Sequence, residues 1–65
     1  MTGREIAIAI RERCRAIGKT PKRIFHEAGV NPRNYPAWRC QGVKMPSPER
    51  VNAVFATLER YEHAQ

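Results

Sequence analysis

The sequence contains no aspartate, so its only acidic side chains are six glutamates, set against twelve lysines and arginines. The net charge is +6 and the pI lies near 10.2. A chain with so few acids carries a positive field at neutral pH, which favours a polyanionic partner.

Cysteine is scarce as well, since Cys14 and Cys40 are the only two. Two cysteines are too few for a disulfide framework, and neither lies in a Cys-x-x-Cys pair or near a histidine at metal-ligand spacing. We therefore expect two reduced thiols, with Cys14 as a small buried residue. No metal site and no other cofactor is expected.

Long apolar runs are also missing. No stretch approaches the roughly 18 residues of a membrane span, and the N-terminus lacks the apolar region and cleavage site of a signal peptide. A chain of 65 residues has room for one domain with a modest core and for no large catalytic cleft. His26 and Glu27 are adjacent and point in different directions on a helix, and no nucleophile with an orienting partner is visible. We expect a single cytoplasmic domain over residues 1–65 that is not an enzyme.

The positive charge is concentrated in the middle of the chain. Residues 19–44 carry five of the six net positive charges, because Glu27 is their only acid, whereas residues 1–18 and 45–65 are nearly neutral. The basic residues of this segment are Lys19, Lys22, Arg23, Arg33, Arg39 and Lys44. The middle segment is therefore the candidate binding region.

Start and stop signals predict an all-α fold of four helices, at about 3–17, 20–28, 32–41 and 48–62. Thr2 and Glu5 have the spacing of a capping box, and Gly18 is a natural left-handed stop for the first helix. Its apolar residues recur at steps of four, four and three, which places them on one face. They are Ile6, Ile10, Cys14 and Ile17.

The second helix is short. Thr20 and Pro21 combine an N-cap hydroxyl with a proline at the first helical position, and Gly29 follows the helix as a stop. Ile24, Phe25 and Ala28 form its apolar stripe, and Val30 follows in the turn as a residue that fills the core.

The third helix has a conflicting feature. Asn31 and Pro32 form another cap-plus-proline signature, and the segment directs Tyr35 and Trp38 inward, with Cys40 as a third candidate, before Gly42 ends it. Pro36, however, would remove a backbone donor if the helix began at Pro32. Either the first turn is distorted, or the helix begins nearer Asn34 and places Pro36 in the permissive first turn.

The last helix has the clearest period. Ser47 is its expected N-cap, ahead of Pro48, and residues 62–65 are expected to fray. The apolar residues at helical spacing are Val51, Val54, Phe55, Leu58 and Tyr61.

Two short helices joined by a glycine-containing turn, here residues 28–31, are typical of a helix-turn-helix. The order of elements resembles the lambda-repressor-like family, which includes phage repressors and Cro-type regulators, over residues 4 to about 61. The resemblance depends on Ala28-Gly29-Val30-Asn31, Trp38, Gly42 and Pro46-Ser47-Pro48-Glu49.

The resemblance implies a repressor-type transcriptional regulator of phage, mobile-element or antitoxin origin, which binds double-stranded DNA as a homodimer and associates with the nucleoid. The third helix would enter the major groove and meet base edges with its N-terminal residues. The base contacts expected by position are Pro32, Arg33, Asn34 and Ala37. The phosphate contacts expected around them are Lys19, Thr20, Lys22, Arg23, Asn31, Arg39 and Lys44.

Two other functions compete with this one. A protein-binding adaptor or inhibitor could keep the same scaffold and use its basic face against an acidic protein, since fold does not dictate function. Pro36 favours this alternative, because a bent third helix is a poorer groove reader. RNA binding is a third hypothesis, although no aromatic platform for unstacked bases stands out.

Overall fold

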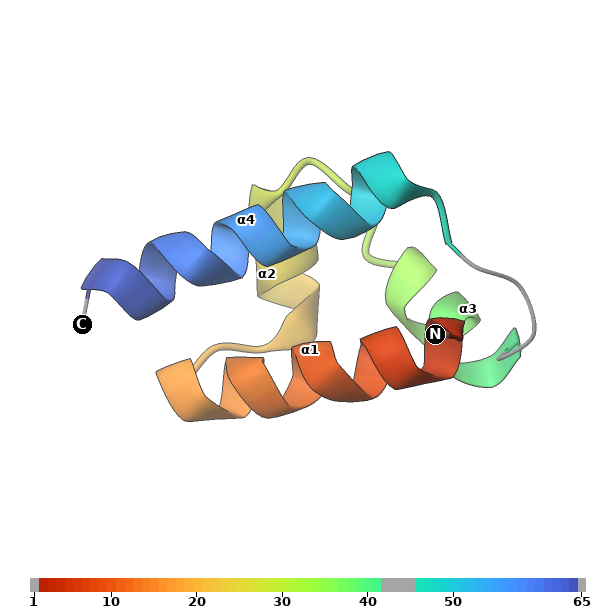
Figure 1. The fold of residues 1–65 in the computed structure, drawn as a ribbon, viewed down its shortest axis with the longest axis horizontal. Coiled ribbons are helices and arrows are strands. Elements are labelled where there is room, and N and C mark those ends of the chain that lie inside the picture. Colours follow the sequence, from red (N-terminus) through yellow and green to blue (C-terminus); the bar gives the residue numbers. More distant parts are fainter. Residues whose placement is uncertain (1, 42–45, 65) are drawn as a thin grey trace.

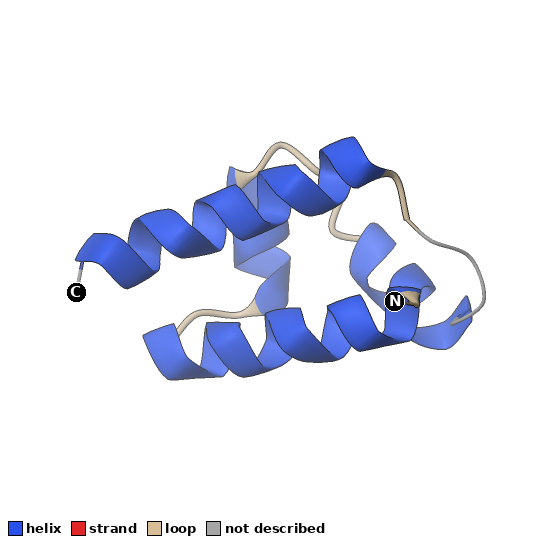
Figure 2. Ribbon diagram, viewed as in Figure 1, coloured by secondary structure: helices blue, strands red, loops and turns tan. Residues whose placement is uncertain are grey.

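The computed structural model describes residues 2–41 and 46–64, and these fold into helices joined by turns (Figures 1 and 2). The helices of this described part are α1 (Gly3–Ile17), α2 (Pro21–Glu27), α3 (Asn34–Gln41) and α4 (Pro48–Ala64). The described residues therefore form an all-α structure.

Helices α1 and α4 run side by side along the long axis of the molecule (Figure 1). Helix α2 lies behind them and spans the distance from one to the other, and α3 packs across the N-terminal end of α1. Every helix therefore contributes to one shared interior. No helix in the described part is both long enough and apolar enough to cross a lipid bilayer.

The capping signals of α1 are confirmed. The Thr2 hydroxyl accepts from the Glu5 backbone N–H at 3.2 Å, and the Glu5 carboxylate accepts from the Thr2 N–H at 3.2 Å, which is the reciprocal pair of a capping box. Gly18 ends the helix with φ +71°, in the left-handed region that glycine enters without strain. Both ends of α1 are thus determined by residues next to them in the sequence.

Helix α3 begins at Asn34 and not at Pro32. Asn31 does not start a helix but forms a turn, in which its side-chain oxygen accepts from the Arg33 N–H at 3.0 Å. The first-turn N–H groups of a helix have no intrahelical partner, so Pro36, the third residue of α3, interrupts no hydrogen bond. The connection between α2 and α3 consequently covers residues 28–33, two more than the expected 28–31.

Two other expectations on helix ends are corrected. Helix α2 covers Pro21–Glu27, with Thr20 and Ala28 as caps rather than members. Helix α4 continues to Ala64, two residues beyond the expected end at 62. Within the segment 62–65, which was expected to fray, Glu62 accepts two hydrogen bonds from Arg13 of α1, and Gln65 lies outside the described residues.

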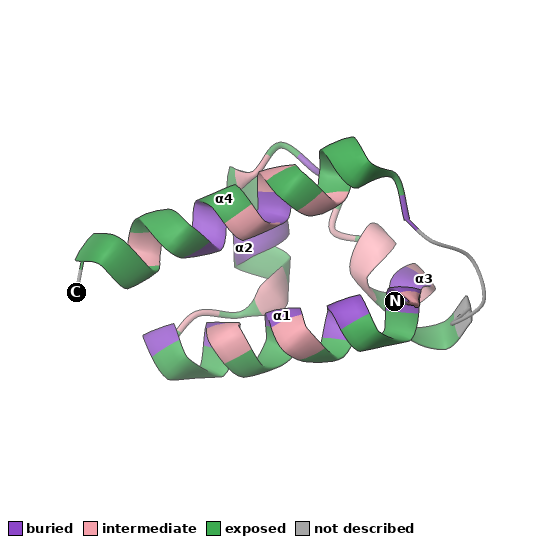
Figure 3. Ribbon diagram, in the orientation of Figure 1, coloured by how far each residue is buried: buried purple, intermediate pink, exposed green. Residues whose placement is uncertain are grey.

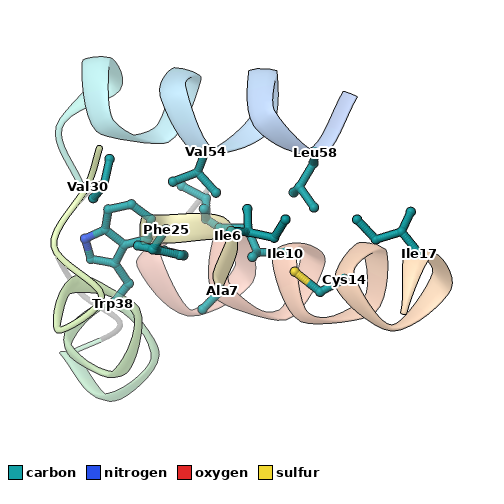
Figure 4. Packing of buried hydrophobic residues seen from close by; sticks show 11 residues of the cluster. Ile6, Ala7, Ile10, Cys14, Ile17, Phe25, Val30, Trp38, Val54 and Leu58 are labelled. Carbon is teal, nitrogen blue, oxygen red and sulfur yellow. The ribbon is translucent and has the colours of Figure 1, made fainter. Parts of the chain in front are cut away.

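The core lies between the four helices, on their facing sides (Figure 3). Phe25 lies beside Trp38 in this core (Figure 4). Its ring centroid is 5.1 Å from that of Trp38 and 5.8 Å from that of Tyr35. The predicted inward positions of α1 are buried, and so is Val30 in the connection. The buried apolar residues are Ile6, Ala7, Ile10, Cys14, Ile17, Ile24, Phe25, Val30, Trp38, Val54 and Leu58.

Candidate nucleic-acid interface

A surface groove of about 340 Å³ lies along α2, between this helix and the connection that leads to α3. The residues that line it are Thr20, Lys22, Arg23, His26, Glu27 and Pro32. Four of these, Thr20, Lys22, Arg23 and Pro32, are predicted DNA contacts, so the fold brings part of the predicted site to one concave surface.

Thr20 forms one edge of the groove and caps α2. Its side-chain oxygen accepts from the Arg23 backbone N–H at 3.2 Å, which leaves the hydroxyl hydrogen free to donate. Lys22 and Arg23 follow in the first turn of α2, and both side chains are exposed. The groove therefore presents two cations and one hydroxyl donor, an arrangement suited to anionic oxygens.

Arg33 stands beside the groove, in the residue before α3. Its carbonyl accepts from the Ala37 N–H at 3.4 Å, so it occupies the N-cap position, and its side chain is exposed. Neither Arg33 nor Lys22 forms a salt bridge with another residue of the described part. Their full charge is thus available to a ligand.

Asn34 is placed differently from the expectation for a base-reading residue. It is half-buried, its amide nitrogen donates to the Asn31 carbonyl at 2.9 Å, and its amide oxygen accepts from Arg50 at 3.4 Å. Asn34 therefore stabilises the turn before α3, with one hydrogen of its amide nitrogen and one lone pair of its amide oxygen already engaged.

The remaining predicted contacts are not among the residues that line the groove, and they differ in exposure. Asn31 is exposed, Ala37 is half-buried, and Arg39 is exposed with its guanidinium carbon 5.8 Å from the centroid of the Tyr35 ring. Lys44 lies outside the described residues, as does Gly42, the expected end of the third helix.

Lys19 belongs to a network that the sequence does not reveal. Its ammonium nitrogen lies 5.3 Å from the centroid of the Tyr61 ring, and the Tyr61 hydroxyl donates to Glu27 at 2.5 Å. Glu27 also accepts from Arg23 at 3.1 Å. The hydrogen bond from Tyr61, and then that from Arg23, hold the pKa of the Glu27 carboxyl below its ordinary value, while Glu27 raises the pKa of the Tyr61 hydroxyl.

The two cysteines differ in their surroundings. Cys14 is buried as expected, and burial raises the pKa of its thiol to about 11, so it is an unreactive neutral thiol at neutral pH. Cys40 is exposed, so the inward position considered for it is wrong. Trp38 already points into the core, and a residue two positions later lies about 200° around the helix. The described residues include no cluster of three or more metal-ligating side chains.

Sequence reasoning missed the partners that come from distant segments. Tyr61 reaches Glu27 across 34 residues, Arg50 reaches Asn34 across 16, and the Arg4 guanidinium donates to the Arg39 carbonyl across 35, at 3.5 Å. Helical periodicity indicates which face of a helix is apolar, but it contains no signal for such polar pairs.

Comparison with known proteins gave no match: no family model fits the chain, and no curated protein or solved structure is significantly similar to it.

Proposed function

We propose that this protein is a sequence-specific, double-stranded DNA-binding transcriptional regulator of repressor type, in which α2 and α3 act as a helix-turn-helix of the lambda-repressor-like kind. The observation that carries the proposal is the groove at the start of α2. Lys22 and Arg23 line it beside Pro32, and the exposed Arg33 follows at the N-cap of α3.

In this proposal the first turn of α2 grips the phosphate backbone while the start of α3 meets the bases. Lysine and arginine pair with phosphate oxygens without regard to sequence and fix the protein on the duplex. An arginine at the start of the inserted helix can bond to O6 and N7 of guanine, and the methyl group of Ala37 can contact thymine. Arg33 is the foremost base-reading candidate, because the amide of Asn34 already has intramolecular partners.

A homodimer remains part of the proposal on grounds of footprint. A single module of this kind covers roughly 600 to 1,000 Å², and pairing on a pseudo-palindromic site doubles that area. The candidate pairing surface is α4, with the exposed parts of Phe55, Leu58 or Tyr61. Leu58 is fully buried, so it adds no surface for pairing. Phe55 and Tyr61 are half-buried, with the basic side chains of Arg13 and Lys19 over their rings.

The adaptor alternative loses its supporting observation. It depended on a third helix bent by Pro36, and Pro36 lies in the first turn of α3, where it interrupts no hydrogen bond. An acidic protein and RNA therefore enter the experiment only as competitors of the duplex.

The test is a selection of bound sequences from random duplex, followed by titrations on the selected site and on a scrambled one. We expect a pseudo-palindromic consensus. Arg33→Ala should cost about 1 to 3 kcal/mol on the selected site and much less on the scrambled duplex. Arg11→Ala, which removes an exposed arginine from α1, is the matched control and should weaken both only slightly. Equal losses on both duplexes for Arg33→Ala refute its role in base reading, and tighter binding to RNA refutes the proposal.

A further inference from the structure

Glu27 is an acidic side chain in the wall of an otherwise basic groove. Both of its oxygens are engaged. One accepts from the Nε hydrogen of Arg23, one helical turn earlier on α2, at 3.1 Å, and the other accepts from the Tyr61 hydroxyl of α4 at 2.5 Å. The carboxylate thus connects a groove-lining arginine to a tyrosine on another helix.

Tyr61 is itself held in place. Its ring is half-buried against the core. The ammonium of Lys19, which lies in the connection between α1 and α2, is 5.3 Å from the centroid of this ring. Because the Tyr61 hydroxyl belongs to a packed ring, its hydrogen bond restricts the position of the Glu27 carboxylate. The carboxylate in turn restricts the position of the Arg23 guanidinium.

Arg23 keeps its ligand-binding end available in this arrangement. A guanidinium has five N–H donors in a planar fork, and Glu27 takes the one on Nε. The side chain remains 64% exposed, so the terminal nitrogens can form the bidentate pair with phosphate that this fork favours. An arginine that is already ordered loses less rotamer entropy on binding than a free one.

We infer that Glu27 and Tyr61 are positioning residues, which hold Arg23 in the orientation that grips a backbone phosphate of DNA. The inference rests on the proposed function and deepens it. It makes a prediction opposite to that of simple charge counting, in which removal of an acid from a basic surface strengthens the binding of a polyanion.

The experiment is a double-mutant cycle on the binding of a labelled random-sequence duplex at one fixed salt concentration. Tyr61→Phe keeps the ring, the contact with Lys19 and the net charge, and removes only the hydroxyl. It should weaken binding about threefold, the loss expected when one side chain must be ordered on binding. Arg23→Ala should weaken binding about tenfold, as expected for one charge-assisted contact. Adding Tyr61→Phe to Arg23→Ala should then cause no further loss.

Glu27→Gln distinguishes the positioning role from simple charge counting, because the two predict opposite changes in DNA affinity. It raises the net charge by one and should nevertheless weaken binding, because the amide has one acceptor oxygen in place of two and no charge, so it holds the guanidinium less firmly. Glu12→Gln removes an exposed acid from α1 and is the matched control, which should leave binding unchanged or slightly tighter. Thermal unfolding of each variant shows whether it is folded. If either Tyr61→Phe or Glu27→Gln fails to fold, the other of these two variants decides the test.

The positioning role is overturned if Glu27→Gln binds as tightly as Glu12→Gln, or if Tyr61→Phe weakens binding by the same factor with and without Arg23. Both results presuppose a wild-type protein that binds duplex, so they leave the proposed function intact. A wild-type protein that binds no duplex at any salt concentration refutes the proposed function, and this inference with it.

Discussion

Basic side chains are used differently on two sides of the molecule. Where α1 meets α4, Arg13 donates to Glu62 at 2.8 and 2.5 Å and lies 5.1 Å from the centroid of the Phe55 ring. Where α2 leads into α3, Lys22 and Arg33 are exposed and form no salt bridge within the described residues. Arg13 therefore joins two helices, whereas Lys22 and Arg33 have no acidic partner among the described residues.

Helix α3 contains the same division within a single element. Trp38, on the inner side of α3, is buried in the core, whereas Arg33, the N-cap residue just before α3, is exposed to solvent. Stability and ligand binding should therefore be separable by substitution.

Substitution of the inner side should affect stability most. Trp38→Ala removes a side chain that is 8% exposed and packs against Phe25 at an interplanar angle of 55°, and should lower the free energy of unfolding by about 3 to 5 kcal/mol. Trp38→Phe keeps an aromatic ring and should lose much less. Denaturant unfolding measures both, and a Trp38→Ala variant as stable as the wild type would show that the aromatic cluster does not support the fold.

Alkaline pH should weaken the same core through Cys14. The pKa of this thiol is raised to about 11 by burial, so the unfolded chain loses the proton first. The free energy of unfolding should fall from about pH 8.5 upward, at up to about 1.4 kcal/mol per pH unit, until the folded thiol also ionises. Cys14→Ala should flatten this dependence at a lower overall stability. If the free energy of unfolding of Cys14→Ala falls with alkaline pH as steeply as that of the wild type, the dependence comes from other groups, such as Tyr61.

On the groove side, Lys22→Ala should change DNA binding and not stability. We expect weaker binding of every duplex, with the slope of log affinity against log salt reduced by about 1, and a free energy of unfolding within about 0.5 kcal/mol of the wild type. The same expectation applies to Lys44→Ala. A salt slope that does not change in either variant would remove that lysine from the phosphate contacts.

The paired side should show the smallest effect. Glu62→Gln removes an exposed ion pair and should lower the Tm by about 5 °C or less, with DNA binding unchanged. The hydrogen bond from Arg13 lowers the pKa of the Glu62 carboxyl in the folded protein. The stabilisation by this ion pair is therefore fully present above the pKa that the carboxyl has in the unfolded chain, and it is lost as the pH falls through the pKa of the folded state. Glu62→Gln should therefore lose less stability between pH 5 and 3 than the wild type. Weakened DNA binding in this variant would contradict the separation of the two sides.

Local signals predicted the helices well because their physical causes are local. The hydroxyls of Thr2 and Thr20 cap their helices through the N–H group three residues later, and Gly18 enters the left-handed region at the end of α1. The start of α3 was ambiguous, because Asn31 followed by Pro32 suits a helix start and a turn equally well. The restriction at Pro36 favours the later start, which the structure has.

The sequence predicted the positively charged segment that contains the candidate site. It did not predict which side chains of other helices pair with the residues of that segment. Which acid neutralises which base depends on how α4 packs against α1 and α2, and that packing is set by the shape of the core. Glu27 shows both cases: its pair with Arg23 is local, one helical turn away, whereas the hydrogen bond that it accepts from Tyr61 comes from 34 residues away and has no signal in the sequence. Asn34 had the right chemistry for adenine, yet the fold gives its amide two intramolecular partners.

DNA binding by α2 and the start of α3 can be tested by the backbone amide shifts that change when duplex DNA is added to ¹⁵N-labelled protein. We expect the changes to concentrate in residues 20–27 and 31–37, and the exposed α4 residues Glu49, Asn52, Ala56 and Glu59 to remain unaffected. Changes concentrated in these α4 residues, or no changes at any salt concentration, would contradict DNA binding by α2 and the start of α3.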